Sequence, residues 1–271
     1  FGLDLAFTGR VLRDAGDDPG SVFHRRMGPR TLVMGHSMGG GIATKILTLD
    51  DRPLAAVLYA PNSADDADLI ARWAEFDQPL HHGGADSRFT LSVACNWKLA
   101  VENYCESYHL PWVHPGLNSY SRLEDHYNIV APGKYSGQGT LVYRQLTGDD
   151  GVVFPDFAGL DDKWLSGGEY VTVFPNVLLG VQRDHTFVIV LEPQAIDRTR
   201  EHVHLFYACP DTDAGLRSRN AAQWRAVFEE DIFVVEGMQK GRHAPHFDGG
   251  RFSPAMDAPT HCFHDWLSGR I

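Results

Sequence analysis

The side chains best suited to chemistry lie between residues 96 and 114, where two histidines stand among aromatic and acidic residues. His109 and His114 are five positions apart, Pro111 lies between them, and Glu106 precedes His109 by three positions. Two imidazoles and one carboxylate can occupy one face of an Fe(II) ion and leave the opposite positions open for O2. The segment predicts part of a buried metal site; the alternative is a pair of core histidines hydrogen-bonded to the backbone.

A second motif predicts a different chemistry. Gly35-His36-Ser37-Met38-Gly39 follows a short apolar run and precedes a helical pattern, as in the nucleophile elbow of serine hydrolases. The stretch resembles the middle of an α/β-hydrolase, which implies Ser37 as the nucleophile. A serine hydrolase also needs an acid and a histidine later in the chain, and no such pattern follows Trp73. A serine esterase using Ser37 is therefore the alternative function.

A helix is expected to position the first half of the metal-binding segment. Asn96 can cap the N-terminus of this helix, and Pro111 is expected to end it. Helical spacing then places Glu106 and His109 near one face, with His114 in the following turn, where it can fold back toward His109.

The second half of the chain favours an antiparallel sheet followed by a long helix. Short β-rich runs separated by turn residues are expected as strands at 140–145, 169–174, 177–183, 186–191 and 202–208, with a hairpin at Asp184-His185. Apolar residues recur at helical spacing over residues 214–237. This helix contains Glu229-Glu230-Asp231; such a triplet is usually a solvated face, but apolar residues that must pack follow Asp231.

These motifs together resemble the catalytic domain of the α subunit of Rieske-type non-haem iron oxygenases, from about residue 85 to residue 271. The resemblance implies that His109, His114 and Asp231 are the iron ligands. It also implies that Glu106, with Asn103 beside it in the catalytic set, links the iron to an electron-donating cluster. A glutamate at position 106 is more similar to the branch that acts on quaternary ammonium compounds.

The expected fold class is α+β: an antiparallel helix-grip sheet of the START/SRPBCC type with a long C-terminal helix, preceded by a partial α/β segment. Two domains are expected, an α/β-hydrolase-like fragment at residues 1–75 and the iron oxygenase catalytic domain at residues 76–271. Strand residues Val177, Leu179 and Phe187 are expected to line an apolar pocket.

The resemblance implies an oxygenase that uses Fe(II) and O2 to hydroxylate, dihydroxylate or oxidatively demethylate an aromatic or quaternary ammonium substrate, in the manner of enzymes of aromatic catabolism. It also implies a homotrimer. The four cysteines are scattered, with no C-x-H or C-x-x-C pair. The electrons are therefore expected from a [2Fe–2S] centre outside this chain, served by a ferredoxin or an NAD(P)H-dependent reductase.

Composition excludes two classes of partner. The chain of 271 residues has 35 acidic and 24 basic residues and a net charge of −11, which argues against nucleic acid. It contains no run of eighteen apolar residues, so no membrane span is expected. The scattered cysteines favour reduced thiols in a cytoplasmic protein.

Overall fold

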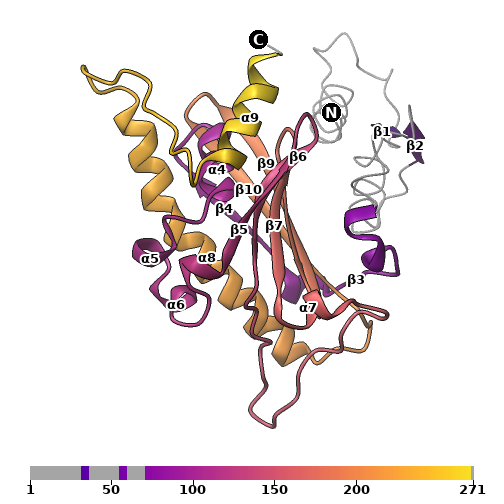
Figure 1. Ribbon diagram of the computed structural model, residues 1–271. Helices are drawn as coiled ribbons and strands as arrows, with labels where there is room; N and C mark the ends of the chain where they lie inside the picture. The colour runs from indigo at the N-terminus through magenta and orange to yellow at the C-terminus, as the bar shows by residue number, and fades with distance from the viewer. Residues whose placement is uncertain (1–31, 37–54, 60–70, 270–271) are drawn as a thin grey trace. The chain divides into compact units, whose positions relative to one another are not determined.

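The computed structural model describes residues 32–36, 55–59 and 71–269, and the chain divides into two compact units, Phe1–Gln78 and Pro79–Ile271 (Figure 1). In the first unit, β1 (Leu32–His36) and β2 (Ala55–Tyr59) form a parallel pair, and the 3-10 helix η1 covers Ala74–Phe76. Ser37 and the helix predicted after it lie outside the described residues.

An eight-stranded antiparallel sheet is the framework of the second unit. Its strands follow the order β3-β10-β9-β8-β7-β6-β5, and β4 pairs with β10 on the same side as β3. The bounds are β3 His81–His82, β4 Arg88–Val93, β5 His126–Ala131, β6 Tyr135–Thr140, β7 Gly168–Val173, β8 Val177–Gln182, β9 His185–Ala195 and β10 Arg198–Tyr207.

The predicted strands over residues 169–208 and the hairpin turn before β9 are confirmed as β7 to β10. The strand predicted at 140–145 is wrong, because β6 ends at Thr140. There the Thr140 hydroxyl accepts a hydrogen bond from the Val142 N–H and turns the chain out of the sheet. The real strand carries Gly137 and Gly139, and glycine weakens the sequence signal of a strand.

Helices α4, α8 and α9 pack against this sheet. The bounds of the helices are α4 Trp97–Cys105, α5 Leu110–Val113, α6 Pro115–Asn118, α7 Asp162–Ser166, α8 Ala214–Gly241 and α9 Ala258–Ser268, with 3-10 turns η2 Gly84–Ser87 and η3 Leu123–Asp125. The long helix α8 runs beside the sheet, and α4 contacts both α8 and α9 (Figure 1). The predicted α+β class, an antiparallel sheet with a long helix near the C-terminus, is confirmed.

The core lies between the sheet and α8. On β10 the side chains of Val203, Leu205 and Tyr207 are fully buried, as the two-residue repeat of a strand requires when one face is covered. Facing them, Trp224 and Phe228 of α8 stack on each other at 5.6 Å between ring centroids. Aromatic burial of this kind contributes about 2 kcal/mol or more per side chain, and it fixes α8 against the sheet.

Candidate metal centre

The segment that carries the two histidines is a helix followed by two short turns. Asn96 caps α4 as predicted, because its side-chain oxygen accepts a hydrogen bond from the Lys98 N–H. The helix ends at Cys105, earlier than predicted, because Glu106 already has extended backbone angles. Pro111 stands in the first turn of α5, where its missing N–H leaves no bond unmade.

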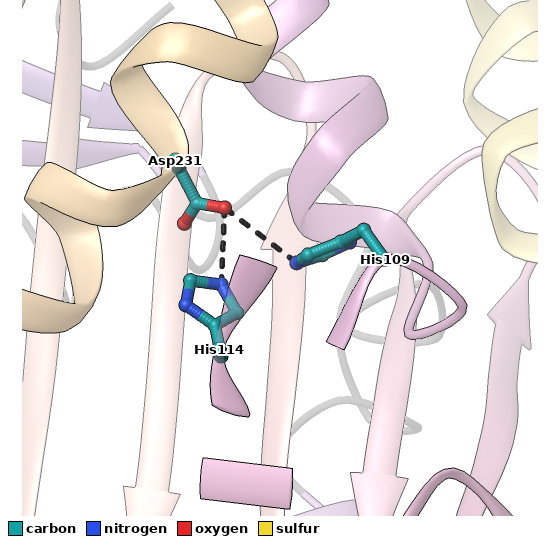
Figure 2. A group of neighbouring side chains, drawn as sticks. All are labelled: His109, His114 and Asp231. Atoms are coloured by element: carbon teal, nitrogen blue, oxygen red, sulfur yellow. Dashed lines mark ion pairs between the residues drawn. The ribbon is translucent and has the colours of Figure 1, made fainter. Parts of the chain in front are cut away.

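The three predicted ligand residues meet at one point. Nε2 of His114 lies 3.0 Å from Oδ1 of Asp231, and Nε2 of His109 lies 3.5 Å from the same oxygen (Figure 2). The imidazole rings face each other edge to face, 5.1 Å apart. Donor atoms of the three residues all lie within 4.8 Å of one another, the arrangement that a small cation requires.

The donor set fits Fe(II). Oδ1 of Asp231 is buried and has no hydrogen-bond partner among the described residues, although two imidazole nitrogens face it. An orphaned carboxylate oxygen of this kind is costly unless a cation satisfies it. Two imidazoles and one carboxylate on one side, with a cavity on the other, form the donor set of non-haem Fe(II) oxygenases.

Each of the two candidate ligand histidines has a carboxylate behind it. Nδ1 of His109 lies 2.6 Å from Oε1 of Glu106, and Nδ1 of His114 lies 2.7 Å from Oε2 of Glu230. Burial lowers the pKa of His114, but contacts with Asp231 and Glu230 outweigh burial and leave this pKa raised. Glu106 was predicted in the site, whereas Glu230 was not distinguished from an ordinary solvated helix face.

A chain of hydrogen bonds holds Glu106 from the sheet side. Nε2 of Gln138 donates to the Glu106 carbonyl, and Oε1 of Gln138 lies 2.6 Å from Nδ1 of His126. Nε2 of His126 in turn contacts the Ser121 hydroxyl at 3.0 Å. Burial is the main cause that lowers the pKa of His126. These three supporting residues were missed, because nothing in their local sequence marks them as neighbours of Glu106.

Hydrogen bonds between α8 and the start of α4 fix the position of Asp231, the candidate carboxylate ligand. Glu236 accepts a hydrogen bond from the Ala94 N–H and Gln239 accepts one from the Asn96 N–H, so α8 is joined to the start of α4. Further along α4, Glu102 binds Arg242, the residue after the end of α8, at 2.6 Å, and His264 of α9 at 3.0 Å. α4 is therefore joined both to α8, which carries Asp231, and to α9.

A narrow cavity of about 90 Å³ opens beside the three ligand residues. Asn103, predicted in the catalytic set, is buried and lines it. Of the three strand residues expected in the lining, Phe187 lies there, whereas Val177 and Leu179 do not. Seven aromatic side chains form one part of the lining, called here the aromatic wall: Tyr104, Tyr120, Tyr143, Tyr170, Phe187, Trp224 and Phe228.

A buried carboxylate lies behind this aromatic wall. Asp184 is fully buried and accepts hydrogen bonds from the Tyr143 hydroxyl at 2.8 Å and from Nε2 of Gln145 at 3.2 Å. The Trp224 indole N–H donates to Nε2 of His185, so the proton of this ring sits on Nδ1 and is directed at Asp184, 2.8 Å away. Burial alone would raise the pKa of Asp184, but these interactions outweigh it and lower the pKa.

One further buried acid adjoins the site. Glu201 on β10 is buried, and burial, with a smaller effect from the Asp231 charge, raises its pKa to about 8.

No helix in the described part of the chain is long and apolar enough to cross a membrane.

Residues 80–271 match the protein family described as ring hydroxylating alpha subunit, catalytic domain. Chloroplastic choline monooxygenase from Arabidopsis thaliana is 29% identical over 199 residues, covering 68% of this chain and 43% of that protein. Putrescine 2-hydroxylase from Ralstonia nicotianae is 28% identical over 189 residues, covering 63% and 50%. The chain thus spans about half the length of the relatives it matches.

Solved structures of the same kind are also similar. A quaternary ammonium Rieske monooxygenase in complex with gamma-butyrobetaine gives a TM-score of 0.48 at 18% identity, covering 69% of this chain and 46% of that one. Dicamba monooxygenase bound to dicamba gives a TM-score of 0.48 at 12% identity, covering 77% and 61%.

Proposed function

Because the chain belongs to the ring hydroxylating alpha subunit family through its catalytic domain, we propose that residues 80–271 form a mononuclear non-haem iron oxygenase domain. In this proposal His109, His114 and Asp231 hold Fe(II), and a small organic substrate binds in the adjoining cavity. The observation that carries the proposal is the convergence of two Nε2 atoms and one unpaired carboxylate oxygen at the cavity wall.

Bound Fe(II) would supply the activation of O2. The protein's own residues supply position and exclusion of water. Glu106 accepts a hydrogen bond from Nδ1–H of His109 and so directs Nε2 at the metal position. The aromatic wall excludes water from the face where the substrate would lie.

Electrons have to reach this site from elsewhere. The four cysteines are scattered and make no cluster-binding motif within these 271 residues. The source in this proposal is a [2Fe–2S] centre outside the sequence, reduced by an NAD(P)H-dependent partner. Glu106, buried against His109, is the proposed link to that centre across a homotrimer interface.

The substrate we propose is a small organic cation, oxidised by hydroxylation or oxidative demethylation. Support comes from the cavity, because aromatic faces attract ammonium groups and the Asp184 carboxylate behind them is held ionised. The related proteins named for choline and putrescine act on compounds of this class. We expect choline to bind more tightly than its neutral carbon isostere, 3,3-dimethylbutan-1-ol, by roughly fivefold or more.

Anaerobic Fe(II) titration tests the metal site. Wild type should bind one Fe(II) per chain, and His109→Ala and Asp231→Ala should lose this binding. Ser37→Ala is the matched control and should bind iron as wild type does. Undiminished iron in His109→Ala would contradict the proposal, and ester hydrolysis lost in Ser37→Ala without any bound iron would favour the serine esterase instead.

A further inference from the structure

We propose that Glu230 is a positioning residue for the metal centre, which holds the His114 imidazole in the orientation and tautomer that metal binding needs. The inference rests on the proposed function, because it assigns a role toward the same metal. Its starting point is the 2.7 Å contact between Oε2 of Glu230 and Nδ1 of His114.

The chemistry of this contact fixes the proton on the ring. An ionised carboxylate only accepts hydrogen bonds, so Nδ1 of His114 must carry the hydrogen. Nε2 is then left with a free lone pair, and this is the nitrogen that lies 3.0 Å from Asp231. A carboxylate on the far nitrogen also increases the basicity of a ligand imidazole.

Two consecutive residues of α8 contact the two nitrogen atoms of the His114 imidazole. Glu230 contacts Nδ1, and Asp231 faces Nε2. His114 itself lies in the short link between α5 and α6, and its side chain makes no capping hydrogen bond to α6. We therefore infer that the orientation of the His114 imidazole is set by its contacts with α8.

The three acids of the triplet are unequal. Glu229 pairs with Arg225 one turn away at 3.7 Å, and both side chains are about half exposed. Glu230 is similarly exposed, at 44%, but its partner His114 is 3% exposed. An exposed pair such as Glu229 with Arg225 contributes little to stability, whereas a carboxylate that holds a ligand imidazole affects metal affinity about 10- to 100-fold.

The matched pair Glu230→Ala and Glu229→Ala separates the two roles. We use Co(II) as the probe, because it resists oxidation and its visible absorption reports coordination. Glu230→Ala should bind Co(II) about 10- to 100-fold more weakly, and Glu229→Ala should bind within about twofold of wild type. Glu230→Gln keeps an acceptor oxygen for Nδ1–H of His114, so its Co(II) affinity should lie between those of Glu230→Ala and wild type.

The unfolding of the metal-free variants and the Co(II) absorption band distinguish a role in positioning His114 from a general loss of stability. Metal-free Glu230→Ala leaves the buried Nδ1–H of His114 without its acceptor, so its thermal midpoint should be lower than that of metal-free Glu229→Ala, but it should remain folded at room temperature. The absorption band of Co(II)-saturated Glu230→Ala should differ from that of wild type, which a loss of stability alone would not cause. Wild-type affinity and an unchanged band in Glu230→Ala would overturn the role of Glu230 and leave the metal site standing. Absence of Co(II) and Fe(II) binding in wild type would overturn the proposed function and this inference together.

Discussion

The buried carboxylate of Asp184 offers the sharpest test of the network behind the cavity. In Asp184→Ala the Tyr143 hydroxyl and the His185 Nδ1–H lose their acceptor inside the core. Gln145 keeps other acceptors, the Phe154 carbonyl at 3.2 Å and Asp156 at 3.1 Å. Two orphaned donors at about 1–3 kcal/mol each give an expected loss of about 4 kcal/mol in the free energy of unfolding.

Asp184→Asn should lose less. The amide oxygen can still accept from Tyr143 and His185, so the variant mainly loses the difference between charged and neutral hydrogen bonds, about 2 kcal/mol in all. Asp156→Asn is the control, because Asp156 also accepts from Gln145 but is exposed to solvent and paired with Arg183. We expect its loss to stay below about 1 kcal/mol.

Urea unfolding of the metal-free proteins, followed by tryptophan fluorescence and circular dichroism, measures these differences. The pKa of Asp184 is lower in the folded than in the unfolded protein. Its stabilising effect is therefore complete above the unfolded pKa of about 3.9 and lost as pH falls through the folded-state pKa. The gap between wild type and Asp184→Asn should accordingly narrow at acidic pH. Equal losses for Asp184→Asn and Asp156→Asn at pH 7 would refute the reasoning.

Three further predictions concern neighbouring features. The pKa of Glu201 is raised to about 8 in the folded protein, so ionising Glu201 lowers the free energy of unfolding increasingly between about pH 4.5 and pH 8. In urea unfolding, Glu201→Gln should therefore be more stable than wild type by on the order of 4 kcal/mol at pH 8 and equally stable at about pH 4.5. In Gly137→Ala the new Cβ would overlap the Tyr170 carbonyl, whereas in Gly237→Ala the new Cβ on α8 meets open space. Thermal unfolding should show that Gly137→Ala lowers the stability by about 2 kcal/mol or more and that Gly237→Ala raises it by about 0.5–1 kcal/mol. Excess Fe(II), at about 100 times its Kd, should stabilise wild type by about 2.7 kcal/mol but leave Asp231→Ala unchanged in a thermal scan.

Much of the fold could be predicted because its signals are local. The Asn96 cap and the apolar repeats of β7 to β10 and α8 each depend on neighbouring residues, and each was found in the sequence. The wrong strand at 140–145 and the missed β5 come from the pair β5–β6, in which β6 carries Gly137 and Gly139 and the stability depends on pairing and not on strand propensity. The helix predicted to reach Pro111 stops at Cys105 instead, because Glu106 turns toward His109.

The candidate site was only partly visible in the sequence. His109, His114 and Asp231 were found through the resemblance of their motifs, and the structure brings them together. Glu230 and Gln138 act on the site through contacts that span 116 and 32 residues of chain. Contacts of such range have no spacing rule, so a single sequence does not reveal them.

Helix α8 carries residues of both the proposed metal site and the aromatic wall, and its regular turn fixes their relative positions. Trp224 and Asp231 are seven residues apart, which is close to two full turns at about 100° per residue. One residue inserted between them would swing Asp231 by about 100° and advance it by about 1.5 Å, away from both histidines. The same insertion in the turn at Gly148–Gly151 would alter neither. The number of residues is therefore fixed within α8 but free in the turn at Gly148–Gly151. Variants of this turn could change the cavity shape and keep the three residues of the proposed metal site together.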